Sequence, residues 1–234
     1  MGRRFGGTAL GVALALTFAP SAAWAEDYEP IDCSEVKCVA LTFDDGPGRY
    51  TKRYLKILRR HDAVATFFVI GSQVSGHKSL VKKMAAEGHE IASHTWNHPA
   101  LTSLSGAQID KQLERTARRI EKVTGVRPAL VRPPYGSMNG RVLKAIGRSG
   151  ASAILWDVDT RDWEHRSASR VFNHVKRDTR RGSIILMHDL HRASADALDR
   201  IITHLERRGF TLVTVSDILG GQPKDGKAYH SGLR

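Results

Sequence analysis

Short β-rich runs alternate with amphipathic stretches along this chain, and that alternation constrains the fold more than any other feature. The stretches between the runs carry apolar residues at helical spacing, and Ser105 with Gln108 forms a capping-box signature at the start of one of them. A strand, helix, strand rhythm of this kind indicates parallel pairing. The expected strands lie near residues 38–44, 65–71, 90–94, 129–132, 151–158, 183–188 and 210–215.

Polar residues capable of chemistry stand at the ends of five of these runs. They are Asp44 and Asp45 after the first run, His94 after the third, Arg132–Tyr135 after the fourth, Asp159–Trp163 after the fifth and His188 after the sixth. If they form one site, five strand ends must converge, as they do at the C-terminal face of a barrel but poorly in an open sheet. We therefore predict a barrel-like α/β fold with parallel strands and a site at their C-terminal ends.

The N-terminal 25 residues predict a secretory signal peptide. Arg3 and Arg4 precede an apolar stretch at about residues 8–19, which leads to the small residues before Glu26. The apolar stretch is too short to span a bilayer comfortably, so no stable membrane insertion is expected once it is removed. An uncleaved anchor is the alternative, and the export route stays open.

The remaining residues are enough for one sizeable core. We expect a leader at residues 26–37, one domain at residues 38–219 and a tail at residues 220–234. The tail is polar and rich in glycine, which indicates a mobile segment. Cys33 and Cys38 are the only cysteines of the chain, and an exported protein favours a disulfide between them over an incomplete metal site.

The chain is strongly basic. Its formal net charge is +12, and Arg3 and Arg4 account for two of those charges within the expected signal peptide. The surplus either solubilises the protein or attracts it to a polyanion such as an anionic cell wall. The basic residues lack interleaved aromatic residues and a recognisable nucleic-acid motif, so specific nucleic-acid binding is not expected.

The clearest chemical signal is a pair of adjacent carboxylates, Asp44 and Asp45, where Gly46-Pro47 ends an apolar run. Neighbouring strand side chains point in different directions, so one carboxylate could bind a metal while the other handles protons. His94 and His98 supply two imidazoles four positions apart. One acid with two histidines is a common ligand set of catalytic metal sites.

Five motifs, taken together and in order, resemble the polysaccharide deacetylases of carbohydrate esterase family four, whose catalytic unit is the NodB-homology domain. The resemblance covers about residues 38–219 and implies a distorted (β/α)7-8 barrel that binds a divalent metal and removes acetyl groups from sugars. Five motifs at ordered spacing are far more specific than any one of them. They are Thr42-Phe43-Asp44-Asp45-Gly46-Pro47, Ser93-His94-Thr95-Trp96-Asn97-His98, Arg132-Pro133-Pro134-Tyr135, Asp159-Thr160-Arg161-Asp162-Trp163 and Leu186-Met187-His188.

The resemblance implies that Asp45, His94 and His98 are the metal ligands. It also implies that Asp44 is the general base and that Arg132 pairs with this acid, fixing its orientation and keeping it ionised. One divalent ion is expected, zinc first, with cobalt or another divalent ion as alternatives because this ligand set selects weakly among them.

For the remaining positions the resemblance implies that His188 is the general acid and that Asp162 orients it. The backbone N–H of Tyr135 is expected to stabilise the oxyanion. Trp163 and Leu186 match positions that wall the acetyl pocket, although each on its own would be an ordinary core residue.

The leading hypothesis is an exported hydrolase that removes N-acetyl groups from an amino-sugar polymer, peptidoglycan first and chitin-type chains next. The basic charge favours an anionic wall over neutral chitin or xylan. We expect a monomer, either secreted or associated with the cell wall. The enzymatic alternative is an acetylxylan O-deacetylase. The non-enzymatic alternative is a polysaccharide-binding barrel without activity, against which the complete set of acid, base and metal residues argues.

Overall fold

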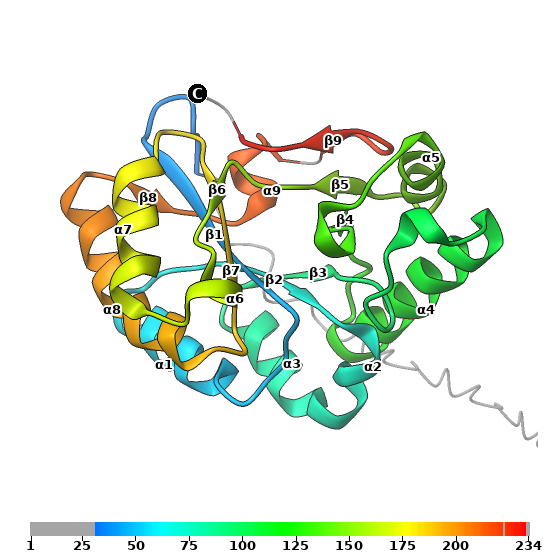
Figure 1. Cartoon of the computed structure of the whole chain (residues 1–234), viewed down its shortest axis with the longest axis horizontal. Helices are drawn as coiled ribbons and strands as arrows, with labels where there is room; N and C mark the ends of the chain where they lie inside the picture. The colour runs from blue at the N-terminus through cyan, green and yellow to red at the C-terminus, as the bar shows by residue number, and fades with distance from the viewer. Residues whose placement is uncertain (1–30, 222, 233–234) are drawn as a thin grey trace, which may run out of the picture.

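The computed structural model describes residues 31–221 and 223–232, and its centre is a sheet of parallel strands curled into a half-barrel (Figure 1). The strand order is β6-β7-β1-β2-β3-β4-β5-β9, and β8 pairs with β1. The strands are β1 (Cys38–Asp44), β2 (Thr66–Val69), β3 (Glu90–Ser93), β4 (Leu130–Val131), β5 (Ser152–Ile154), β6 (Val158–Asp159), β7 (Ile184–His188), β8 (Thr211–Leu212) and β9 (Ala228–Tyr229). The distorted parallel barrel expected from the sequence is therefore confirmed.

Helices cover the outer face of the curled sheet, with α7, α8, α1 and α3 around one half and α4 and α5 around the other (Figure 1). The α-helices are α1 (Thr51–Arg60), α2 (Gly71–Val74), α3 (Lys78–Ala86), α4 (Gly106–Thr124), α5 (Gly140–Arg148), α6 (Asp162–His165), α7 (Ala168–Asp178), α8 (Arg192–Arg207) and α9 (Val215–Ile218). Three 3₁₀ turns, η1 (Ser75–His77), η2 (Leu101–Ser103) and η3 (Pro134–Gly136), connect some of these elements. At the start of α4 the expected capping box between Ser105 and Gln108 forms.

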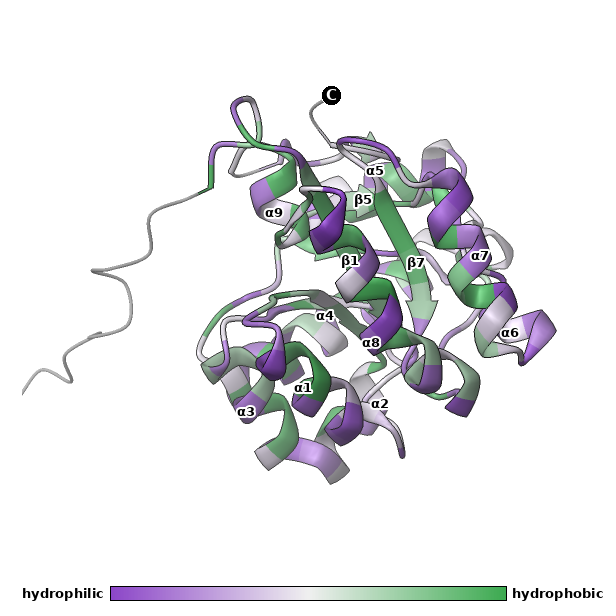
Figure 2. Cartoon of the chain, turned by 90° about the vertical axis from the view of Figure 1, so that its left-hand side faces the viewer, coloured by the Kyte–Doolittle hydropathy of each residue, from purple (hydrophilic) through white to green (hydrophobic). Residues whose placement is uncertain are grey.

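Alternation along β1 separates the core from the site. Val39, Leu41 and Phe43 are buried in the cluster that packs the sheet against α1, α3, α7 and α8. Thr42 and Asp44, which point to the opposite face, lie inside the barrel and are also buried. Figure 2 shows β7 as hydrophobic along most of its length, as expected for a strand covered on both faces.

The run at residues 151–158 was predicted as one strand, and the structure corrects this. It contains two short strands, β5 and β6, which lie towards opposite ends of the sheet order. Leu155, Trp156 and Asp157 connect them across the open side of the barrel (Figure 1). The Asp157 carboxylate accepts a 2.8 Å hydrogen bond from the N–H of Ile184, which attaches the connection to β7. We call residues 155–157 the seam.

The segment expected as a C-terminal tail contains a strand within its described residues. Ala228–Tyr229 forms β9, which pairs with β5, and Ser231 bridges to Ser183 near the start of β7. This strand adds to the edge that β5 presents at the open side, so its order depends on a partner far away in the sequence. At the other end, Cys33 and Cys38 are joined by a disulfide.

The expected signal peptide lies outside the described residues. Within residues 31–221 and 223–232, no helix has both the length and the apolar character needed to cross a membrane.

Candidate active site

The predicted site residues converge on one cavity of about 460 Å³ at the C-terminal ends of the strands. Most come from the end of a strand or from the loop that follows it, whereas Leu186 lies within β7 and Asp162 and Trp163 lie in α6. The barrel thus brings together segments that are far apart in the sequence. The cavity is lined by Asp44, Asp45, His94, His98, Pro133, Tyr135, Trp156, Asp159, Trp163, Leu186 and His188. Arg132 and Asp162, the other two predicted residues, lie behind this lining and contact Asp44 and His188.

Asp44 and Arg132 form a buried ion pair inside the barrel. Arg132 is fully buried, and its Nη1 donates 2.7 Å hydrogen bonds to Asp44 Oδ1 and Thr42 Oγ1. Its Nε and Nη2 donate to the carbonyl oxygens of Ile154 and Leu155, at 3.2 and 3.1 Å. Burial raises the pKa of Asp44 above its usual range, and the charge of Arg132 opposes that rise. The guanidinium therefore holds one carboxylate oxygen and leaves the other facing the cavity.

Asp45, His94 and His98 bring three potential ligand atoms within 4.8 Å of one another. His94 Nε2 lies 3.5 Å from Asp45 Oδ1, and His98 Nε2 lies 3.3 Å from the same oxygen. Ligands at about 2.0–2.2 Å from a tetrahedral zinc ion lie about 3.3 Å apart, so these separations suit one ion. Asp45 Oδ1 is buried without a hydrogen-bond partner among the described residues, as expected of an atom that a cation would satisfy.

The tautomer of His94 also fits a metal ligand. Its Nδ1 lies 2.7 Å from the carbonyl oxygen of Arg132, so Nδ1 carries the proton and Nε2 presents a lone pair to Asp45 and His98. Burial lowers the pKa of His94 to about 3, which keeps the imidazole neutral. The backbone N–H of His98 donates to Thr95 Oγ1 at 3.2 Å, which fixes the loop between the two histidines.

His188 and Asp162 form a second hydrogen-bonded pair beside the cavity. His188 Nδ1 lies 2.7 Å from Asp162 Oδ1, and the backbone N–H of His188 donates to Oδ2 at 2.8 Å. Burial alone would lower the pKa of His188, but Asp162, with smaller contributions from Asp44 and Asp45, raises it to about 9. Burial likewise disfavours the charge on Asp162, yet the hydrogen bonds from His188 and Ser194 hold its pKa below the usual range. The imidazole is therefore protonated at neutral pH.

Three side chains give the cavity an apolar side. Leu186 is buried in β7, whereas Trp163 is 48% exposed and Tyr135 is 72% exposed. The Tyr135 ring packs edge-on against His98, with ring centroids 4.7 Å apart. Trp163 and Leu186, which were expected to wall an acetyl pocket, thus line the cavity, and Tyr135 lies beside His98.

Backbone strain accompanies these side chains. Asp45, Thr95, His98, Tyr135 and Arg161 all have left-handed backbone conformations, with φ between 51° and 70°. Such conformations are costly for residues other than glycine and cluster at functional sites. All five residues belong to the motifs identified in the sequence. Their strained backbone conformations help to set the directions in which the side chains after the strand ends point.

Sequence reasoning missed several residues of the site. Trp156 lines the cavity from the seam but was assigned to the middle of a strand. Ser194, near the start of α8, donates a 2.5 Å hydrogen bond to Asp162 Oδ2. A serine in the first turn of a helix is too common to signal such a contact.

Asp189 was also missed, although it directly follows His188. It is fully buried, its Oδ2 accepts a hydrogen bond from Thr51, and burial raises its pKa to about 7. A Cβ atom at Gly46 would come within 2.4 Å of the Asp189 carboxylate. This contact explains why the loop after Asp45 carries a glycine.

Comparison with known proteins agrees with this geometry. The sequence matches the polysaccharide deacetylase family model over residues 32–154. The peptidoglycan-N-acetylglucosamine deacetylase PgdA of Listeria monocytogenes is 41% identical over 194 residues, which are 82% of this chain and 41% of PgdA. The peptidoglycan-N-acetylmuramic acid deacetylase PdaC of Bacillus subtilis is 42% identical over 81% of this chain and 40% of PdaC. The chain thus spans about two fifths of these two relatives.

Solved structures agree as well. The structure of T48 deacetylase with substrate is 42% identical to this chain, with a TM-score of 0.81, and the match covers 85% of this chain and 99% of that one. The structure of PdaC itself has a TM-score of 0.75, with 80% of this chain and 91% of that one covered. The family match covers the first three of the strand-end motifs that build the cavity, those at residues 42–47, 93–98 and 132–135. The chain therefore belongs to the polysaccharide deacetylase family.

Proposed function

We propose that this chain is a metal-dependent hydrolase that removes N-acetyl groups from the amino sugars of peptidoglycan. One observation carries the proposal. The Asp45, His94 and His98 cluster lies in the same cavity as a buried carboxylate held by Arg132 and an imidazole held by Asp162. A site that hydrolyses an amide needs a base, an acid and an electrophile, and this cavity has a residue or residue set suited to each.

Asp45, His94 and His98 would hold the divalent ion, zinc first. Three protein ligands leave coordination positions open, as in catalytic rather than structural zinc sites. When bound, such an ion polarises a carbonyl oxygen and makes water at the site more acidic.

Asp44 is the base of this proposal. Its Oδ1 is fixed by Arg132, so Oδ2, which lies 3.7 Å from His94 Nε2, faces the ligand cluster and can take a proton from water there. Burial makes Asp44 a stronger base than an exposed carboxylate, while Arg132 keeps it ionised. Arg132 is thus a positioning residue that acts through Asp44.

His188 is the acid. Because its Nδ1–H is directed at Asp162, the proton on Nε2 is available to a group in the cavity. An amine leaves a tetrahedral intermediate readily only after protonation, so His188 would supply that proton to the sugar nitrogen. The backbone N–H of Tyr135 is proposed to donate to the oxyanion, and Trp163 with Leu186 to enclose the acetyl methyl group.

Peptidoglycan is the proposed substrate because the names of PgdA and PdaC specify it. Those names differ in the sugar that is deacetylated, so N-acetylglucosamine and N-acetylmuramic acid are both included. A wall substrate agrees with the signal peptide expected at residues 1–25 and with the net charge of +12. We accordingly place the mature protein outside the cell or on its wall.

Acetate release tests the proposal. The protein is incubated with peptidoglycan, chitin oligomers and acetylxylan, after chelation and again after zinc or cobalt is restored. We expect metal-dependent acetate release that is fastest from peptidoglycan, and its loss in Asp44→Asn. Asp199→Asn, which removes an exposed carboxylate on α8, is the matched control and should retain activity. Activity that survives thorough chelation contradicts the metal role, and release from acetylxylan alone identifies an esterase instead.

A further inference from the structure

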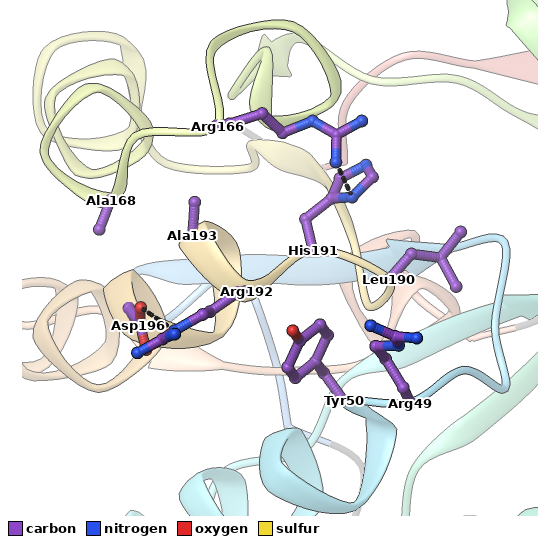
Figure 3. Close-up of a pocket in the computed structure, with 9 residues that line it drawn as sticks. All are labelled: Arg49, Tyr50, Arg166, Ala168, Leu190, His191, Arg192, Ala193 and Asp196. Atoms are coloured by element: carbon purple, nitrogen blue, oxygen red, sulfur yellow. Dashed lines mark hydrogen bonds and ion pairs between the residues drawn. The ribbon is translucent and has the colours of Figure 1, made fainter.

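A second cavity, of about 470 Å³, opens beside the active site and is lined by basic side chains (Figure 3). We call it the arginine pocket. Its lining includes Arg49, Tyr50, Arg166, Leu190, His191 and Arg192. The catalytic proposal assigns none of these residues a role.

The arginine pocket is built from the continuations of three active-site loops. Arg49 follows Asp45 in the first loop, and Arg166 follows Trp163 in the second. His191 follows His188 in the third, and the two imidazole rings are 5.9 Å apart. The exposed Trp163 is tied to the pocket because Arg166 Nε donates to its carbonyl oxygen at 3.2 Å. The arginine pocket therefore adjoins the part of the catalytic cavity that Trp163 and His188 line.

The positive charge of the pocket is only partly compensated. Arg192 lies 3.5 Å from Asp196, the one acidic residue of the lining, but Arg53 also contacts Asp196, at 2.6 Å. Arg49 has no hydrogen-bond or ion-pair partner within the described part of the chain. Arg166 donates to His191 Nδ1 at 2.8 Å, and that nitrogen can accept only while the ring is neutral.

The side chains approach the cavity from two directions. Figure 3 shows Arg166 and His191 on one side and Arg49 with Tyr50 on the other. Arginines on facing walls suit a planar anion, because a guanidinium can donate two parallel hydrogen bonds to a carboxylate.

We propose that the arginine pocket binds a carboxylate carried by the substrate on a sugar next to the one that is deacetylated. The inference rests on the proposed function and makes it more specific. Muramic acid carries a lactyl carboxylate, and its peptide stem carries further carboxylates, whereas chitin has none. The pocket thus selects glycans that alternate neutral and acidic sugars over neutral polymers.

The test compares kcat/KM for matched substrates. One arm uses glycan strands freed of peptides, which keep only the lactyl carboxylates. A second arm uses strands that keep their peptide stems. A third arm uses both kinds of strand after their carboxylates have been converted to amides, and a fourth uses neutral chitin oligomers. The variant is Arg49→Gln with Arg192→Gln. Its matched control is Lys122→Gln with Arg207→Gln, which removes equal charge from the C-terminal ends of α4 and α8.

We expect the wild type to prefer carboxylated over amidated strands. The double variant should lose about 2- to 25-fold of that preference, since each exposed ion pair contributes about 1.4- to 5-fold. The control should keep the preference, and added salt should weaken it in the wild type. If the preference for carboxylated over amidated strands appears only when the stems are present, the pocket binds peptide carboxylates. If it also appears with bare strands, the pocket binds the lactyl carboxylate.

Equal turnover of carboxylated and amidated strands by the wild type overturns the inference, as does a preference that the double variant retains. Calorimetric binding of the same strands separates this failure from that of the proposed function. Carboxylate-dependent binding without acetate release refutes only the proposed activity. Acetate release without any carboxylate dependence refutes only the arginine pocket.

Discussion

Replacing Asp162 with Asn should convert His188 from a protonated acid into a neutral imidazole across the neutral pH range. In the wild type Asp162 raises the pKa of His188 to about 9, although burial acts to lower it. Asn keeps the shape of the side chain and removes the charge, so burial then dominates and the pKa falls below about 6.5.

The size of the effect follows from the two protonated fractions. At pH 8 about nine tenths of His188 is protonated in the wild type, against at most about 3% in Asp162→Asn. Amide turnover should therefore drop by about thirtyfold or more at pH 8 and by a much smaller factor at pH 6. The basic limb of the pH profile should move by more than about two pH units towards acid.

The assay measures kcat/KM between pH 5 and 10 for a chitin oligomer and for an activated acetate ester. The ester leaving group needs no proton, so its turnover should change little. Asp159→Asn is the matched control, because Asp159 lines the same cavity but accepts from the backbone N–H of Arg161. An unchanged basic limb in Asp162→Asn, or equal losses for amide and ester, would refute the reasoning.

Three further predictions concern stability and metal binding. Arg132→Met leaves Asp44 buried without its partner and should cost about 3–5 kcal/mol in urea unfolding; a loss below about 1 kcal/mol would show that Asp44 becomes solvated or neutral instead. Gly46→Ala should destabilise by about 1–3 kcal/mol through its contact with the Asp189 carboxylate, and Asp189→Ala should relieve most of that loss; additive effects would contradict the steric explanation. Zinc at about a hundred times its Kd should stabilise the wild type by about 2.7 kcal/mol in thermal unfolding, and His98→Ala should abolish the shift; an equal shift in both proteins would place the ion elsewhere.

Every residue that lines the cavity except Trp156 belongs to a motif identified in the sequence, because the chemically active residues lie at strand ends. Asp44, His94 and His188 each directly end or follow an apolar run, and parallel strands place such residues on one face. Local sequence patterns were sufficient to find these lining residues, because each motif lies at the end of a single strand. What they could not give were the left-handed backbones that direct Asp45 and Tyr135.

The seam and the last strand could not be predicted, for a different reason. Residues 151–158 read as one apolar strand, because periodicity records burial and not which strand each residue pairs with. Ala228–Tyr229 lies in a polar segment rich in glycine, and its order comes from the exposed edge of β5. Ser194 likewise gains its role only from the three-dimensional position of Asp162.

The incomplete closure of the barrel also decides how a cation can be kept in its interior. The carbonyl oxygens of Ile154 and Leu155, where β5 ends and the chain turns away, accept from the guanidinium of Arg132. In a fully hydrogen-bonded barrel those oxygens would bond to an adjoining backbone, and the interior would offer the arginine only Asp44 and Thr42. An engineered version of this fold whose open side is closed by continuous strand pairing would therefore lose the buried ion pair between Arg132 and Asp44, even if its strands were more regular.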